Sequence, residues 1–394
     1  MQINAPVIGA AAAWCLVVSA GAGEHPVNLL TADSATTLGG YVSTSAGWSP
    51  GAGTAFLPAY KYGGAGKSDG FNLDGVNLTL EHPLDETRFA AGYRVDLLFG
   101  PDAAAFGSQS TGIRGDLAIR QAYVELLVPV ENGLHLKFGV FDRTLGYESF
   151  DTTVDAHFTR SWGHTIEPST HTGMLASYAF DHEWSADLGV ADTVGPVINQ
   201  RASLVPGGAR VESARTGLAA LHFSAPESWE LFHNLALSSG WVSGFQNGLG
   251  VDQSSWYAGG TWVTPLTNLL VGFAYDYAGL NRQPAAPLTT PAYWNATAGY
   301  ASWQFDPAWA LHGRAEYATR SGNWVAPGTA DRTFSATATL EWKPWHQVLT
   351  RLEFRWDRAV DGTTPFGGAG PVPLPIAGTR QNAFLLAANL VYRF

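Results

Sequence analysis

Residues 350–357 read Thr-Arg-Leu-Glu-Phe-Arg-Trp-Asp, and this stretch decides the fold. Its even positions are mostly apolar and its odd positions are all charged, with Arg351, Glu353, Arg355 and Asp357 on one side. Successive side chains of a β-strand point to opposite faces, so the stretch predicts a strand with one apolar and one charged face. A helix would spread the same charges around its whole circumference.

The same alternation recurs along the chain, in segments about ten residues long. Apolar residues alternate with Arg94 and Asp96, with His135 and Lys137, and with His312, Arg314 and Glu316. One segment is irregular: between Leu117 and Val128, either Arg120 or Gln121 and Glu125 fall on the apolar face. We therefore expect a β-bulge or a position at the rim there, because the extra residue of a bulge changes which face the following side chains take.

The connections between these segments alternate in length. Short connections are expected near Pro83, Pro129, Asp181, Pro226, Pro265, Pro307 and Pro344. Long ones are expected at 49–70, 100–116, 142–171, 192–214, 241–254, 279–292, 319–332 and 358–381. This layout predicts an all-β fold: an antiparallel transmembrane β-barrel of about 16 strands, with short periplasmic turns and long extracellular loops. Closure follows because lipid offers no hydrogen-bond partners to a free sheet edge.

Composition excludes several other classes. Charged residues make up 14% of the chain, against roughly 25% in typical soluble domains. Mean hydropathy is −0.02, and no long apolar run follows the N-terminus, which argues against a helical membrane protein. The net charge of −11 argues against a nucleic-acid partner, whose binding surface would be basic.

The N-terminus is typical of an export signal. An apolar run from Val7 to Val18 is followed by small residues, so we expect a signal peptide over 1–22, cleaved after Ala20 or Ala22, and a barrel domain over 23–394. Cys15 lies within this segment, and the mature chain would then contain no cysteine. Disulfides and cysteine-ligated metals are excluded with it.

Aromatic residues occur beside the short turns and at the C-terminus, and both positions are informative. Trp184, Trp229, Trp309 and Trp345 each lie beside a short turn, which predicts one aromatic girdle at the membrane interface. The last segment has an apolar face that ends in Tyr392 and Phe394, the pattern of a strand that the barrel assembly machinery recognises.

The segment 139–178 carries a family resemblance. It reads GVFDRTLGYESFD and then FTRSWGHTIEPSTHTGMLASY, with FNLDGVNLTLEHPLD upstream at 71–85. These runs resemble the OmpL-like putative beta-barrel porin family of Gram-negative bacteria, most specifically across about residues 70–180. The resemblance implies an outer-membrane porin, but it supplies no substrate and no catalytic residues.

A barrel of this width encloses an aqueous channel, so we expect passive diffusion of small hydrophilic solutes and ions. The third long connection, 142–171, is expected to fold inward and narrow the pore. Its carboxylates are expected to form an acidic constriction opposite a basic wall, so that a transverse field crosses the pore. The acidic set is Asp142, Glu148, Asp151, Asp155 and Glu167, and the basic set is Arg94, Arg314, Arg351 and Arg355. Alternatively, these side chains only hold the loop in place.

Other functions are weighed against this one. No Gly-x-Ser-x-Gly motif occurs, and we expect no enzyme activity, no cofactor and no metal, although His164, Glu167 and His171 have a spacing that resembles a metal motif. A substrate-specific channel and a surface adhesin with a plugged lumen remain as alternatives. The expected partners are outer-membrane lipid, the barrel assembly machinery, small solutes and, by analogy with porins of this width, two further copies in a homotrimer.

Overall fold

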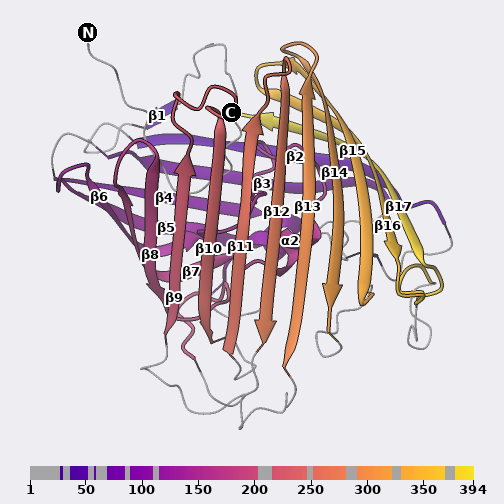
Figure 1. Ribbon diagram of the computed structural model, residues 1–394, viewed down its shortest axis with the longest axis horizontal. Coiled ribbons are helices and arrows are strands. Elements are labelled where there is room, and N and C mark those ends of the chain that lie inside the picture. The colour runs from indigo at the N-terminus through magenta and orange to yellow at the C-terminus, as the bar shows by residue number, and fades with distance from the viewer. Residues whose placement is uncertain are drawn as a thin grey trace.

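The computed structural model describes residues 27–29, 36–51, 57–58, 69–84, 89–109, 115–202, 215–245, 252–280, 291–321, 330–368 and 378–394. The predicted signal peptide lies outside these residues. Within them, sixteen antiparallel strands, β2 to β17, form one closed barrel, because β17 pairs with β2 (Figure 1). A further short strand, β1 (Val27–Leu29), pairs with the beginning of β2.

The strands of the barrel run in chain order, each paired with the next. Their bounds are β2 Thr36–Trp48, β3 Gly70–His82, β4 Ala90–Phe99, β5 Leu117–Val128, β6 Leu134–Asp142, β7 Thr170–Ala179, β8 Trp184–Ala191, β9 Thr216–Ser224, β10 Leu235–Phe245, β11 Asp252–Val263, β12 Leu269–Leu280, β13 Ala292–Gln304, β14 Trp309–Arg320, β15 Arg332–Trp345, β16 Val348–Ala359 and β17 Asn382–Arg393. Two short helices, α1 (Pro101–Phe106) and α2 (Trp162–Ile166), lie in long connections.

The two faces of β16 are as the sequence predicts. Arg351, Glu353 and Arg355 are at most 2% exposed and point into the barrel, whereas Leu352 and Phe354 are 58% and 43% exposed on its outside. The outward row is apolar because it faces hydrocarbon. The alternation of apolar and polar residues therefore assigns the two faces correctly.

The predicted bulge is present in β5. Pairing with β4 shifts between Asp96, which lies opposite Gln121, and Leu97, which lies opposite Ile119, so Arg120 has no direct partner. The extra residue lets both Arg120 and Gln121 point inward, where they are buried.

One connection was predicted too long. β10 continues to Phe245 and β11 begins at Asp252, so most of 241–254 belongs to strands. The Ser- and Gly-rich segment shows little alternation, but Trp241 pairs with Trp256 and their rings lie 6.1 Å apart, which extends the ladder. Conversely, the turn between β9 and β10 is longer than a tight hairpin.

Candidate functional site in the barrel lumen

The connection between β6 and β7, residues 143–169, lies inside the barrel and is called the inner loop below. Its base is closed by the Arg143 N–H, which donates to the Ser169 carbonyl at 3.3 Å. From there the loop reaches residues of the wall that are 154 to 199 positions away in sequence. The helix α2 belongs to this loop and lies within the ring of strands (Figure 1).

Arg351 of β16 binds the backbone of the inner loop. Its guanidinium donates to the carbonyls of Asp155 and His157, both at 2.9 Å, and to the carbonyl of Thr152 at 2.7 Å. Arginine offers five donors in a rigid fork, so one side chain can satisfy several loop carbonyls at once.

Two further arginines bind the same loop. Arg355 donates to the carbonyl of Arg160 at 2.6 Å, and Arg314 of β14 donates to the carbonyl of Thr159 at 2.9 Å. Arg314 also forms an ion pair with the loop carboxylate Glu148, at 2.7 Å. Because buried charges are costly unless paired, these contacts fix the loop against the wall.

Wall carboxylates complete the attachment by accepting loop N–H groups. Glu353 accepts from the backbones of Phe158, at 2.7 Å, and Thr159, at 3.0 Å. Glu316 accepts from the backbone of Trp162 at 2.6 Å. Donors and acceptors of an irregular backbone segment are therefore satisfied inside the lumen, as a buried loop requires.

The opposite side of the inner loop packs on apolar wall residues. Leu145 belongs to a buried cluster with Tyr257 and Tyr300, and the rings of Tyr147 and Tyr300 stack at 4.0 Å. Phe150 receives the Arg120 guanidinium over its ring at 4.2 Å. The loop thus contacts widely separated parts of the barrel wall and occupies the middle of the lumen.

The five predicted acidic residues are all in or at the inner loop, but they differ in surroundings. Glu148, Asp155 and Glu167 are buried, and each forms an ion pair with an arginine. Asp142 is paired with Arg120 and keeps 28% of its side-chain exposure, and Asp151 is half-buried.

The pKa values of two of these loop carboxyls are shifted in opposite directions. Burial raises the pKa of Asp155 to about 7, against the opposing effect of Arg160. Burial also acts to raise the pKa of Glu148, but Arg314 and Arg160 outweigh it and hold that pKa below its ordinary value.

The basic residues are arranged differently from the expected water-facing wall. Arg314, Arg351 and Arg355 have side chains that touch the loop and have essentially no solvent exposure, so they hold the loop instead of facing it across water. Arg94 alone of the four keeps substantial exposure, at 30% of its side chain, and pairs with Asp96 at 3.0 Å. The contacts agree with the alternative that these charges hold the loop in place.

Several residues of this site were not among the predicted ones. Arg120, Glu316, Glu353 and Asp357 all take part in the buried network. The alternation places three of them on the inward face, but it contains no information on which inward residues the loop would reach.

Beyond the inner loop, the two ends of the lumen differ. Toward the long connections, inward-facing Ser255, Trp294 and Thr333 are at most 4% exposed. Toward the short turns, the inward side chains of Glu81, Lys343 and His135 keep 41%, 32% and 26% of their exposure. We call this water-accessible end of the lumen the cup.

Four clusters of charged and histidine side chains line the cup. The first joins Glu81, Arg94 and Asp96; the second Glu125, His135 and Lys137; the third Asp187 and His222; the fourth His312, Glu341 and Lys343. Among the described residues, no group of three or more His, Cys, Asp or Glu is placed to hold a metal ion.

The predicted girdle residues lie at the short-turn end. Trp184, Trp229 and Trp345 are 41%, 48% and 69% exposed, and the half-buried Trp309 stacks on Trp342 at 5.4 Å. At the same end, Phe394 exchanges two backbone hydrogen bonds with Gly40, which ties the C-terminus to β2.

A closed barrel with an apolar exterior, a polar interior and a long loop inside the lumen defines the class of outer-membrane porins. The chain belongs to the family described as "Putative beta-barrel porin-2, OmpL-like", whose match covers residues 35–394. It is accordingly a porin of the bacterial outer membrane. No curated protein matches the sequence significantly.

Solved porins share this fold at low sequence identity. The anion-selective porin from Comamonas acidovorans has a TM-score of 0.60 at 12% identity, covering 91% of this chain and 99% of that one. The outer membrane channel DcaP of Acinetobacter baumannii has a TM-score of 0.58 at 12% identity, with coverages of 93% and 99%. OmpF of Salmonella typhi, in complex with daunomycin, has a TM-score of 0.58 at 10% identity, with coverages of 91% and 97%.

Proposed function

We propose that this porin is a narrow passive channel for small hydrophilic solutes and ions, with the inner loop as its constriction and with no catalytic role. The observation that carries the proposal is the polar, water-accessible cup that leads to a loop fixed across the lumen. A lumen of sixteen strands is wide enough for an aqueous path, and the loop reduces its cross-section.

We further propose that Asp142 and Asp151 supply the acidic charge at the constriction. Both keep solvent exposure, whereas the three other loop carboxylates are buried against arginines. A carboxylate that keeps contact with water can attract a passing ion. A buried carboxylate is already neutralised by its arginine, and separating that pair would be costly. This assignment leaves the buried carboxylates a structural role.

The test is single-channel recording of the purified protein in planar bilayers with KCl. We expect small stepwise currents, and currents several-fold larger when residues 145–167 are replaced by a short Gly-Ser linker, because the lumen is then wider. A linker variant with the same small steps would contradict the loop as constriction.

A second candidate function is a plugged surface barrel, and the near-complete burial of the inner loop favours it. The same recording separates the two: a plugged barrel would be silent with the loop present and would conduct without it. A substrate-specific channel is less favoured, since the inward tyrosines Tyr257 and Tyr300 are buried under the loop and not exposed along a solute path.

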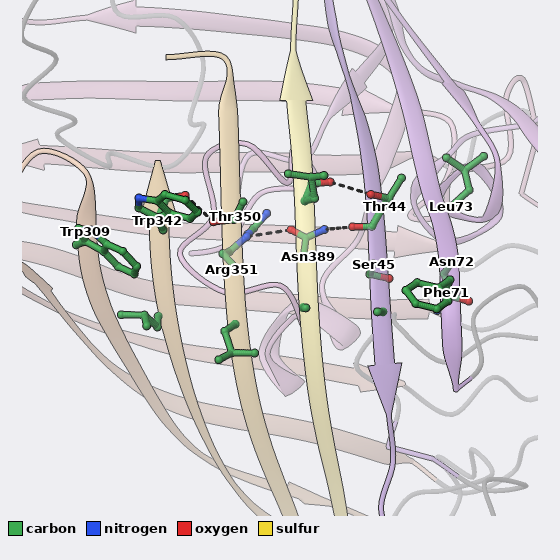
Figure 2. Close-up of a pocket in the computed structure, with 15 residues that line it drawn as sticks. Thr44, Ser45, Phe71, Asn72, Leu73, Trp309, Trp342, Thr350, Arg351 and Asn389 are labelled. Carbon is green, nitrogen blue, oxygen red and sulfur yellow. Dashed lines mark hydrogen bonds between the residues drawn. The ribbon is translucent and has the colours of Figure 1, made fainter. Parts of the chain in front are cut away.

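An outward groove is our proposed contact between copies in a homotrimer. It has a volume of about 780 Å³ and spans strands β14 to β17, β2 and β3 on the outer face (Figure 2). Ala46 and Ala388, register partners on β2 and β17, belong to its lining. Figure 2 shows Trp309 and Trp342 at one edge and Phe71 at the other. Replacing Ala388 by Trp should shift the protein to monomers in unheated gels, whereas Ala258→Trp, on the outer face of β11, should not.

The remaining partners are also proposals. The apolar outer face would contact outer-membrane lipid, and the terminal strand would be read by the barrel assembly machinery through Tyr392 and Phe394, which are 51% and 50% exposed. Both side chains are accessible to another protein before the barrel is surrounded by lipid.

A further inference from the structure

Three histidines of the barrel wall lie in the cup. His135, His222 and His312 each lie within an ion-pair distance of a carboxylate, at 3.2, 3.2 and 3.8 Å, respectively. They come from β6, β9 and β14, so they are distributed around the wall and not clustered at one point. The other charged residues of the four cup clusters are five carboxylates and three Lys or Arg side chains.

These numbers make the net charge of the cup clusters depend on the histidines. With neutral histidines, five carboxylates against three fixed cations leave −2, and three protonated histidines change it to +1. Histidine is the side chain whose charge ordinarily changes between pH 5 and 8. Protonation of all three histidines therefore reverses the sign of this net charge.

The immediate surroundings of His135 and His222 contain few other charges. His135 faces Glu125 from β5, Lys137 lies two residues along its own strand, and Ser177 is its partner on β7. His222 faces Asp187 from β8 at 3.2 Å, with Ser238 opposite it on β10.

His312 has more neighbours. Its Nδ1 lies 2.8 Å from the Ser302 hydroxyl of β13, and Glu341 approaches from β15. Lys343 binds that carboxylate at 2.7 Å, and Arg351 is the register partner of Glu341. The inner loop contributes His157, whose ring lies 6.2 Å away, and Arg314 follows two residues along β14.

We propose that the three histidine–carboxylate pairs of the cup determine the ion selectivity of the channel and reverse it, from cations at about pH 8 to anions at about pH 5.5. The inference rests on the proposed channel function. It differs from selection at the inner loop, because His135, His222 and His312 belong to the barrel wall and keep 26%, 18% and 9% of their side-chain exposure. Ions that pass the cup cross a region whose charge sets their local concentration.

The test is the reversal potential in a KCl gradient. For the wild type we expect the cation-to-anion permeability ratio to fall at least about threefold between pH 8 and pH 5.5 and to pass through one. The triple variant His135→Gln, His222→Gln, His312→Gln should keep its pH 8 ratio at both pH values. A ratio that falls equally in the triple variant would overturn the proposal.

A matched control removes three histidines elsewhere. His182, His233 and His346 lie exposed on short turns, outside the four clusters. The variant with all three replaced by Gln should show the same pH dependence of the permeability ratio as the wild type. If that pH dependence were lost in this control variant, the cup histidines would not be its cause. Heat-modifiable migration in gels shows whether each variant is folded.

A second measurement does not need conduction and keeps the two proposals apart. Pyrenetetrasulfonate is a fluorescent polyanion, and its fluorescence polarisation with the detergent-solubilised protein reports binding. We expect the wild type to bind this anion at pH 5.5 and to bind it at least about tenfold more weakly at pH 8. The triple variant should not bind it at either pH. Silent bilayers with this binding would refute the channel and retain the charge reversal, whereas pH-independent binding would refute the reversal.

Discussion

Arg355 and Arg94 both lie on inward faces of barrel strands, yet their surroundings have little in common. Arg355 is 0% exposed and bonded to the inner loop, whereas Arg94 keeps 30% of its side-chain exposure in the cup. The same difference separates the regions around them. The lumen is packed in its middle and at the end near the long connections, whereas the end near the short turns is accessible to water. Strand alternation decides which side chains point inward. Contacts with the inner loop decide whether an inward-pointing side chain is buried or meets water.

The largest difference should appear when each arginine is truncated. Arg355→Ala removes the ion-pair partner of the buried Asp357 and the donor to a loop carbonyl, and breaking such a buried pair typically costs about 3–5 kcal/mol. Arg94→Ala should cost less than Arg355→Ala, because Arg94 is partly solvated and the buried Asp96 keeps hydrogen bonds from Thr79 and Gln121. Equal shifts in thermal unfolding midpoint would mean that the two regions do not differ as described.

A smaller effect is expected from adding one methyl group. A Cβ at Gly163 would overlap the buried Asp276 carboxylate, so Gly163→Ala must displace that side chain or the inner loop, at a typical cost of about 1–3 kcal/mol. At Gly299, by contrast, nothing lies within 4 Å of the added atom, and Gly299→Ala should change stability by less than about 1 kcal/mol. Both variants are compared with the wild type by their thermal unfolding midpoints and by the current noise of the open channel. A Gly163→Ala protein with unchanged stability and unchanged noise would argue against tight packing of the loop.

The remaining effects concern pH and should be opposite in sign at two loop carboxyls. Burial raises the folded pKa of Asp155 to about 7, while an unfolded carboxyl titrates near 4, so this group loses stabilisation as pH rises between those values. Asp155→Asn should therefore match the wild type near pH 4 and gain stability over it by pH 8.

Glu148 provides the internal comparison. Its folded pKa is held below the ordinary value by Arg314 and Arg160 despite burial, so its stabilisation is present above the unfolded pKa and is lost on acidification. Glu148→Gln should consequently destabilise at pH 7 and less so near pH 3, as measured by unfolding midpoints. The same pH trend in both variants would contradict these assignments.

Much of the fold followed from local patterns. The alternation at 350–357 assigned the inward and outward faces, and the conflict between Arg120 and Gln121 indicated a bulge. The boundaries around 241–254 were less accurate, because Ser and Gly provide weak alternation and the strand there is held by cross-strand pairing such as Trp241 with Trp256.

The sequence by itself determined the barrel, its closure and the two faces of each strand, because these depend on neighbours one or two residues apart and on the choice between lipid and water. Only the tertiary structure decided which inward charges meet water. Many wall partners of the inner loop are 154 to 199 positions away in the sequence, and no local pattern records which residues the loop reaches. For that reason Arg314, Arg351 and Arg355 attach the loop, while Arg94 and His135 keep 30% and 26% of their side-chain exposure.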